Sequence, residues 1–361
     1  MQDNIKLLLK TSSEITTETS YKKVLIKFSN VTKKILNAQR CSIFLHDKKN
    51  KELYTYIAHG VKRIHIKENN GIVGASFLNN EILNISNVYN DKRSDRSFDK
   101  KNNFITKSIL THPLRTREGK VFGVFQVTNK IGRESFTKED CEFLRYISGY
   151  VSEILENQKL NKDIRKAQEE IIYRLSFVTR YKDPETQNHI IRVGLYCSVL
   201  AKALGWSRKK VELIRLAAPM HDIGKVGIPD RILLKPTTLD DEEWSVMKKH
   251  TEYGHKILKG STSKLMKIAA LVALEHHEKW NGKGYPMGKK REEISIYARM
   301  LSLVDVFDAL SSKRHYKNSW PTEETLSLIK SERGKQFDPQ LVDLFLENLN
   351  EILKIRERYG D

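Results

Sequence analysis

Apolar residues recur at helical spacing near the start of the chain and then follow strand-like patterns. Val24, Phe28, Val31 and Ile35 lie three or four residues apart, which predicts an amphipathic helix. Strand-like runs follow at 41–46, 53–58 and 121–127, and apolar side chains alternate in the last of them. A helix followed by antiparallel strands predicts an α+β domain over residues 1–135.

A second helical pattern covers residues 136–181, a stretch without proline. Apolar residues repeat along it at Leu144, Ile147, Val151, Ile154, Leu155, Leu160, Ile164, Ala167, Ile171, Leu175 and Val178. This spacing predicts one long helix, or two helices in line, with an apolar stripe. Gln158 and Asn161 interrupt the stripe, which is too short for a heptad assignment. We expect a homodimer through the first domain and this helix, and we hypothesise that the helix carries a signal by rotation or sliding.

Residues suited to binding metal ions gather in the remaining part of the chain, residues 182–361. Seven of the 11 histidines fall between residues 185 and 317. Eight candidate ligands are all imidazoles or carboxylates: Glu185, His189, His221, Asp222, His250, His276, His277 and Asp305. Any one of them alone has an ordinary structural interpretation. Together they are more than one ion needs, so the sequence predicts a site for several ions, and N/O donors without thiolates favour iron or manganese.

The spacing of these residues indicates how they could be shared between ions. Glu185 and His189 are four apart at the start of an apolar periodic run, so a helix would place them on one face. On a helix, adjacent residues point about 100° apart, so Asp222 could bridge two ions while its neighbour His221 binds one. By the same reasoning His276 and His277 are each expected to bind a different ion. Asp305 and Asp308 lie on an apolar helix, where buried carboxylates need partners or metal.

Two longer motifs connect these ligands to a known family. The run 221–230, beginning His221-Asp222-Ile223-Gly224-Lys225, and the run 276–286, ending Gly284-Tyr285-Pro286, resemble the two signatures of the HD-GYP domain, a branch of the HD phosphohydrolases. The resemblance continues through 298–299, 304–310 and 312–317 and ends near 334–339. His315, Asn281 and Ser295 depart from the family pattern, but none of them replaces a ligand.

This resemblance implies an all-α domain that hydrolyses cyclic di-GMP to pGpG or GMP. It implies two or three metal ions, commonly iron, with manganese as the alternative, and Glu185 with His189 favours three. Asp222 would be the bridging carboxylate beside a bridging hydroxide, with Lys225 donating to a phosphate or leaving oxygen, or serving only as a helix-end lysine. Asp308 would orient a ligand or Lys225. The expected substrate contacts are Lys225, Tyr285, Arg314 and Lys317, with Tyr285 alternatively forming a surface for signalling proteins.

The N-terminal motifs resemble a GAF domain, which makes this half a sensor. They are the segment 71–74, the segment 82–85, and the pair Asn90-Asp91. Asn129-Lys130, followed by Phe136 and Asp140, is similar to the motif of cyclic-nucleotide-binding GAF domains, but Cys141 stands where that motif has glutamate. The same pairing also occurs in GAF domains without a known ligand. A bound nucleotide and a pocket filled by the domain's own side chains therefore both remain open.

Charge and composition limit the remaining function classes. The net charge of +19 is spread along the chain without an aromatic-interleaved basic patch, so we expect no nucleic-acid partner; a positive field would also attract a dianionic dinucleotide. Three cysteines without paired spacing are typical of a reduced, cytoplasmic protein. No apolar run approaches the roughly 20 residues of a membrane span, and the first residues do not resemble a signal peptide, so we expect no membrane contact.

Three functions remain after these observations. The first is a metal-dependent cyclic di-GMP phosphodiesterase regulated by a GAF domain. The second is a signalling adaptor that binds cyclic di-GMP with little turnover, which the complete ligand set disfavours. The third is a hydrolase of another cyclic dinucleotide or phosphate ester. The native metal, the ligand of the sensor, the end product and the direction of regulation are left open by the sequence.

Overall fold

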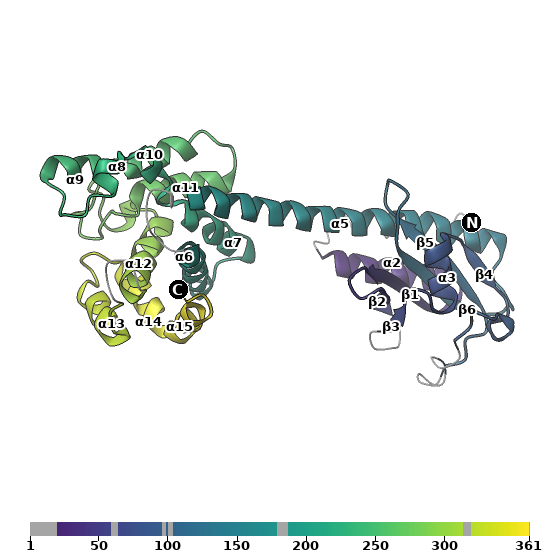
Figure 1. Cartoon of the computed structure of the whole chain (residues 1–361). Helices are drawn as coiled ribbons and strands as arrows, with labels where there is room; N and C mark the ends of the chain where they lie inside the picture. The colour runs from purple at the N-terminus through teal and green to yellow at the C-terminus, as the bar shows by residue number, and fades with distance from the viewer. Residues whose placement is uncertain are drawn as a thin grey trace. The chain divides into compact units, whose positions relative to one another are not determined.

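A computed structural model describes residues 20–58, 64–95, 99, 104–178, 187–312 and 319–360 (Figure 1). The chain divides into two compact units, Met1–Ile164 and Arg165–Asp361. Glu185, Arg314, His315 and Lys317 lie outside the described residues, as does the domain boundary predicted near residue 181. The expectations attached to those positions therefore stay predictions.

The first unit is built on one antiparallel sheet of strand order β3-β2-β1-β6-β5-β4. The strands are β1 (Ala38–Asp47), β2 (Glu52–Ala58), β3 (His65–Lys67), β4 (Leu83–Ile85), β5 (Ile109–Arg115) and β6 (Val121–Lys130). The helices are α2 (Tyr21–Ile35), α3 (Gly71–Asn79), the short 3-10 helix η1 (Val88–Asn90), and the first part of α5 (Lys138–Val178). The predicted helix and all three predicted strands are confirmed.

Alternation along the strands sends side chains to two different layers. Phe125 and Val127 of β6 pack with α2 and with the early turns of α5, where Leu144 and Ile147 are fully buried. Val124, which directly precedes Phe125, points to the opposite face and packs with Val73 of α3. The sheet therefore has α2 and α5 on one face and α3 on the other, which is the α+β sensor architecture expected.

The Asn129-Lys130 motif holds the end of β6 to neighbouring segments. Asn129 adopts a left-handed backbone (φ 57°), and its side-chain oxygen accepts from Lys107 N at 2.7 Å. Its side-chain nitrogen donates to the Ile105 carbonyl, also at 2.7 Å. Lys130 Nζ lies 2.8 Å from a carboxylate oxygen of Asp140, in the first turn of α5. These motif residues thus make their contacts within the protein.

The second unit is helical, with only two isolated β-bridges among its described residues. After the last turns of α5 come α6 (Gln187–Ala203), α7 (Arg208–Ala217), η3 (Ala218–Met220), η4 (Ile223–Gly227), α8 (Asp230–Leu233), α9 (Asp241–Lys248), α10 (His250–Leu258), α11 (Lys264–Glu275), η5 (Arg291–Glu293), α12 (Ile296–Ser311), α13 (Thr322–Ser331), α14 (Pro339–Glu347) and α15 (Leu349–Arg358). This confirms the predicted all-α domain.

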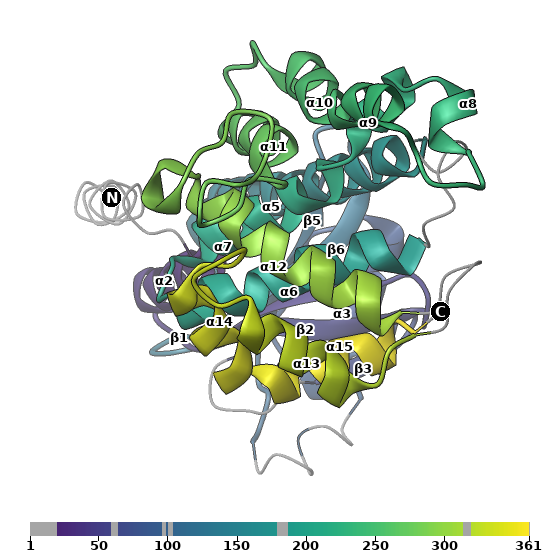
Figure 2. The same cartoon turned by 90° about the vertical axis from the view of Figure 1, so that its left-hand side faces the viewer.

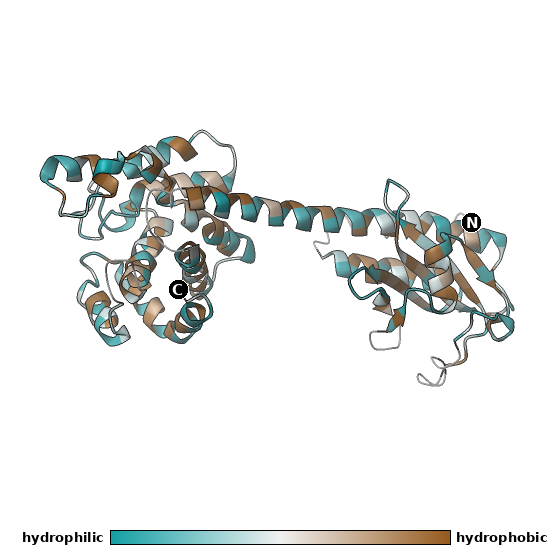
Figure 3. Ribbon diagram, in the orientation of Figure 1, coloured by the Kyte–Doolittle hydropathy of each residue, from teal (hydrophilic) through white to brown (hydrophobic). Residues whose placement is uncertain are grey.

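Helices α6 and α12 lie in the middle of the helical unit, with α7, α11 and α14 around them (Figure 2). Most of the residues that they bury are apolar, and hydrophobic segments are brown in the ribbon of Figure 3. Val193 of α6 and Phe307 of α12 are fully buried in the shared core. At Gly194 an added Cβ would lie 2.6 Å from the Arg215 carbonyl, so glycine lets α6 and α7 approach closely. These two central helices carry His189, Asp305 and Asp308.

The long helix α5 extends into this unit as well. Ile172 is buried in its core, and Arg215 of α7 contacts Glu169 Oε1 at 2.7 Å and the Tyr173 hydroxyl at 3.1 Å. The prediction of one long connecting helix is therefore confirmed. In the part of the chain that the structure describes, no helix is both long and apolar enough to cross a membrane.

Candidate metal centre

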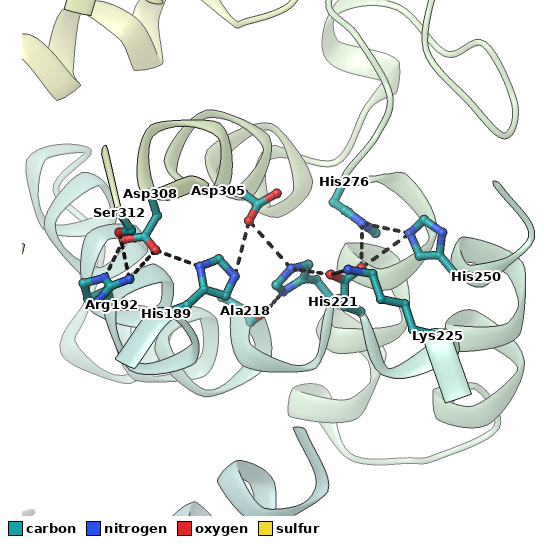
Figure 4. Close-up of polar contacts among 11 residues, drawn as sticks. His189, Arg192, Ala218, His221, Lys225, His250, His276, Asp305, Asp308 and Ser312 are labelled. Carbon is teal, nitrogen blue, oxygen red and sulfur yellow. Dashed lines mark hydrogen bonds and ion pairs between the residues drawn. The ribbon is translucent and has the colours of Figure 1, made fainter. Parts of the chain in front are cut away.

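Seven of the eight predicted ligands converge in two neighbouring groups. Figure 4 labels His189, His221, His250, His276 and Asp305 among them. The four-residue group consists of Asp222, His250, His276 and His277, and the three-residue group consists of His189, His221 and Asp305. Within each group, one ligand atom per residue lies within 4.8 Å of all the others. The eighth predicted ligand, Glu185, lies outside the described residues.

Asp222 lies between the two groups because of the local backbone. His221 and Asp222 follow η3, which contains Pro219, and precede η4. One Asp222 oxygen, Oδ2, is 3.3 Å from His221 Nε2 of the three-residue group. The other, Oδ1, is 3.4 Å from His250 Nε2 of the four-residue group. The carboxylate therefore faces both groups, in the position expected of a bridging ligand.

Glycine at position 224 brings η4 against α10. A Cβ built on Gly224 would lie 1.9 Å from the carbonyl oxygen of His250, a distance that no real side chain tolerates. Because the two backbones touch here, His250 at the start of α10 lies beside Asp222. The glycine of the His-Asp-Ile-Gly-Lys run thus has a packing role that sets the geometry of the four-residue group.

His276 and His277 do not separate as predicted. Both belong to the four-residue group, and their ring centroids are 4.0 Å apart. The prediction assumed a helix, but α11 ends at Glu275, and the two histidines lie in the turn that follows. Released from helical geometry, neighbouring imidazoles can face the same point.

Backbone carbonyls fix the orientation of the imidazoles. His250 Nδ1 lies 2.8 Å from Met247 O, His276 Nδ1 lies 3.1 Å from Val272 O, and His221 Nδ1 lies 2.9 Å from Ala218 O. Because a carbonyl only accepts, these contacts assign the hydrogen to Nδ1. Each neutral ring therefore presents the lone pair of Nε2 to the group, which is the arrangement of a metal-ligating histidine.

Hydrogen-bond acceptors consequently face one another across the groups. His250 Nε2 and His276 Nε2 are 3.4 Å apart, and Asp222 Oδ1 lies within 3.5 Å of both. Such an arrangement of lone pairs is repulsive unless a cation lies among them. The residues present therefore fit a site for metal ions, with mixed nitrogen and oxygen donors.

Burial keeps the histidines in the state that binds metals. It lowers the pKa of His250 to about 4, against the attraction of Asp222. Burial, together with His276 and His250, holds the pKa of His277 well below its ordinary value. Burial alone would raise the pKa of Asp222, but Lys225 and His221 hold it well below the ordinary value. Neutral imidazoles and an ionised carboxylate are the ligand forms required.

Asp308 orients His189, one of the two roles predicted for it. Its Oδ2 accepts a hydrogen bond from His189 Nδ1 at 2.8 Å, so His189 Nε2 points towards Asp305 Oδ1, 3.5 Å away. Burial would raise the pKa of Asp308, but hydrogen bonds from His189 and Arg192 lower it. Lys225, the other group that Asp308 was predicted to orient, contacts Asp222 instead. Its Nζ lies 2.6 Å from Asp222 Oδ2.

Arg192 was missed in the sequence analysis. Its side chain is only 1% exposed, and its Nε donates to Asp308 Oδ1 at 2.6 Å. The available signal was its position on α6, three residues after His189 and beside the buried Val193 and Tyr196. An arginine on the buried stripe of an apolar helix needs a carboxylate partner.

Tyr285 lies against the four-residue group. Its ring stacks on His277 with centroids 4.7 Å apart and planes 23° apart, and it meets Trp244 of α9 edge-on at 6.2 Å. Gly284 allows the loop to fold back, since a Cβ there would lie 2.3 Å from Lys279 N. The predicted substrate contact is therefore placed beside the ligands, with the partly exposed Trp244 as an aromatic neighbour that the sequence analysis did not include.

Comparison with family models identifies both halves of the chain. Residues 22–155 match the GAF domain and residues 178–341 match the HD domain. The chain is therefore a GAF domain followed by an HD domain, and the metal-ligand candidates of the described residues all lie in the HD domain.

Curated relatives agree with this arrangement. The chain is 42% identical over 206 residues to the 3'3'-cGAMP-specific phosphodiesterase 2 of Vibrio cholerae, covering 57% of this chain and 40% of that protein. It is 44% identical over 192 residues to a cyclic di-GMP phosphodiesterase of Thermotoga maritima, covering 53% and 52%. It is 33% identical over 252 residues to a cyclic di-GMP phosphodiesterase response regulator of Xanthomonas campestris, covering 70% and 63%. The chain thus spans between two fifths and two thirds of the length of these relatives.

Proposed function

We propose that this protein is a metal-dependent phosphodiesterase that hydrolyses cyclic di-GMP to pGpG or GMP, under the control of its GAF domain. The observation that carries the proposal is the pair of ligand groups sharing Asp222, in which buried acceptors face one another at 3.3–3.5 Å. Relatives named as cyclic di-GMP phosphodiesterases support the choice of substrate.

The ligands suit two ions, with Glu185 as the residue for a third. Iron is the preferred metal and manganese the alternative, because both accept imidazole and carboxylate donors in octahedral sites. The four-residue group would hold one ion, the three-residue group another, and Asp222 would contact both. When bound, such ions neutralise phosphoryl oxygens and lower the pKa of water towards ~7.

The chain's own residues would bind and orient the phosphodiester. Lys225 Nζ, at 2.6 Å from Asp222 Oδ2, is close enough to donate a proton or hydrogen bond to a phosphate or leaving oxygen beside that carboxylate. Arg314 and Lys317 would clamp the second phosphate. Tyr285, stacked on His277, would contact a base or ribose of the substrate, or alternatively a signalling protein.

Assembly and location complete the proposal. Leu160, Ile164, Ile171 and Leu175 of α5 are each at least 45% exposed, which supports a homodimer formed through this helix. We place the protein in the cytoplasm, where cyclic dinucleotide signals are made and degraded.

A second substrate is favoured by a specific observation. A relative with 42% identity is named a phosphodiesterase specific for 3'3'-cGAMP, which differs from cyclic di-GMP in one base. Both substrates present the same phosphodiester ring to the metal centre, so the choice between them would depend on base contacts such as those of Tyr285. The adaptor alternative is disfavoured because all seven described ligands are present and converge.

The test combines metal analysis with turnover on the same anaerobically purified protein. We expect two to three iron or manganese ions per chain, and conversion of cyclic di-GMP, 3'3'-cGAMP or both to linear products separated by chromatography. His221→Ala should abolish turnover, whereas His255→Ala, a change on α10 outside both groups, should not. Bound metal and bound dinucleotide without any product would replace the hydrolase with the adaptor.

A further inference from the structure

The geometry points to the residues that follow α15 as a positioning element for the three-residue group. We infer that the backbone carbonyls of Tyr359 and Gly360 hold the start of α6, and through it the metal ligand His189, in place. This inference rests on the proposed metal centre, and it assigns that centre a support far from it in sequence.

Two residues that flank His189 contact these carbonyls. Arg192 Nη1 donates to Tyr359 O at 2.7 Å, and Asn188 Nδ2 donates to Gly360 O at 2.7 Å. The sequence separations are 167 and 172 residues, so the contacts join two distant parts of the chain. The first helical turn of α6, which carries His189, is thus held from both sides of the ligand.

Arg192 carries the effect from Tyr359 to the metal ligand. The same guanidinium that contacts the Tyr359 carbonyl donates through Nε and Nη2 to both oxygens of Asp308, at 2.6 and 2.8 Å. Asp308 in turn accepts from His189 Nδ1. A fork of this kind fixes the plane of the carboxylate, and the carboxylate fixes the rotation of the imidazole.

Removing the Tyr359 carbonyl would leave an N–H of a buried cation without that acceptor. Arg192 also donates to Ser312 Oγ at 2.9 Å, but that contact is made by Nη2, on the other side of the fork. Because losing a buried hydrogen-bond acceptor is costly, the guanidinium would shift on the partners that remain, Asp308 and Ser312 among them. Asp308 and His189 would then lose their fixed orientation.

The four-residue group lacks this support within the described part of the chain. The imidazoles of His250 and His276 are oriented by Met247 and Val272, carbonyls of their own helical region. Disturbing the residues after α15 should therefore weaken metal binding by the three-residue group and leave metal binding by the four-residue group unchanged. A general loss of stability would not produce such a selective effect.

The experiment measures Mn²⁺ binding to the metal-free 361-residue chain by calorimetric titration, together with metal counting after dialysis. Two reference variants show which binding event belongs to which group. His221→Ala removes a ligand from the three-residue group, and His277→Ala removes a ligand from the four-residue group. In Arg192→Lys, and in a chain shortened to end at Arg358, we expect the event lost in His221→Ala to weaken by about 10–100-fold, the usual effect of changing a residue that orients a ligand. The other event should keep its affinity.

Arg299→Lys is the matched control. Arg299 forms a largely enclosed ion pair with Asp338 in the same domain, with side chains 12% and 4% exposed, but contacts none of the candidate ligands. Unchanged Mn²⁺ affinity in both the shortened chain and Arg192→Lys, or equal weakening of both events, would overturn the inference. If Arg192→Lys does not fold, the shortened chain and Asn188→Ala decide the question, because both keep the buried Arg192–Asp308 pair. If His221→Ala and His277→Ala bind Mn²⁺ like the unchanged protein, the proposed metal centre itself fails.

Discussion

The histidines of the two domains are satisfied in different ways. In the GAF domain, His46 Nε2 lies 2.6 Å from Glu68 Oε2, and His65 Nδ1 lies 3.2 Å from Glu52 Oε2, so each ring meets a carboxylate of its own. In the HD domain, imidazole nitrogens meet one another and share Asp222. Pairing within the protein indicates a structural role, whereas convergence of acceptors indicates a site for a cation.

The lysine–aspartate pairs of the two domains show the same difference. Lys130 and Asp140 form a pair in which both side chains are nearly nine-tenths buried, and Asp140 also accepts from Thr137 N. Lys225 and Asp222 are similarly enclosed, but Asp222 faces two groups of imidazoles as well. We expect the first pair to contribute to folding and the second to contribute to chemistry.

Replacing Asp222 is expected to have the largest effect. Asp222→Asn retains the shape but removes the charge shared by both ligand groups, so turnover should fall by about 10³-fold or more, equivalent to about 4 kcal/mol. Metal content should fall in the same sample, measured by elemental analysis. Asp343→Asn, in an exposed pair with Arg333, is the control. Full turnover by Asp222→Asn would mean that the Lys225–Asp222 pair, like the Lys130–Asp140 pair, does not contribute to the chemistry.

Breaking the Lys130–Asp140 pair should affect stability rather than chemistry. Lys130→Met leaves Asp140 with an uncompensated, largely buried charge, so the free energy of unfolding of the GAF domain should fall by about 3 kcal/mol. Calorimetry of the full chain measures this loss, and the metal content should stay unchanged. Lys335→Met, in an exposed pair, should have little effect. A stable Lys130→Met variant would mean that the motif lysine is reserved for a ligand.

Most of the fold was predictable because periodicity reports which face of an element is buried. The strands at 41–46, 53–58 and 121–127 and the long helix were all confirmed, with ends that moved by a few residues. Helix ends were harder, because apolar spacing does not show where hydrogen bonding stops. The assumption that His276 and His277 lie on a helix was wrong for this reason, since α11 ends one residue before them.

The ligand types of the site were predictable, but their supports were not. Imidazoles and carboxylates gathered in one region of the sequence indicate a metal site, and seven of these side chains converge in the structure. The role of Arg192 was not predictable because its partners, Asp308 and the carbonyl of Tyr359, lie more than 110 residues away in sequence. Contacts of that kind depend on tertiary packing, which spacing along one helix does not reveal.

His112 is the exception in the GAF domain and makes its stability depend on pH. Burial lowers the pKa of His112 to about 4, and the ring meets its neighbour's carbonyl, Pro113 O, at 2.9 Å. The unfolded chain takes up a proton near the ordinary pKa of ~6.5, before the folded domain does. The contribution of neutral His112 to the free energy of unfolding is therefore complete above that pH. It is lost as pH falls from about 6.5 towards 4, with about 2 kcal/mol lost by pH 5. In His112→Phe this pH-dependent part of the unfolding free energy should disappear, as denaturant titrations at pH 7.5 and 5 would show.

Tyr285 should give the smallest effect and the finest test, because it contacts the metal centre without contributing a ligand. Its ring stacks on His277, so its removal should leave Mn²⁺ affinity nearly unchanged while the substrate loses an aromatic surface. Stacking of a base on an aromatic side chain contributes about 1–3 kcal/mol, so Tyr285→Ala should raise KM about tenfold with a smaller change in kcat. Tyr285→Phe keeps the ring and should restore KM. If Tyr285→Ala instead lowers metal affinity and leaves KM unchanged, the tyrosine orients His277 and belongs with the supports of the site rather than with its substrate contacts.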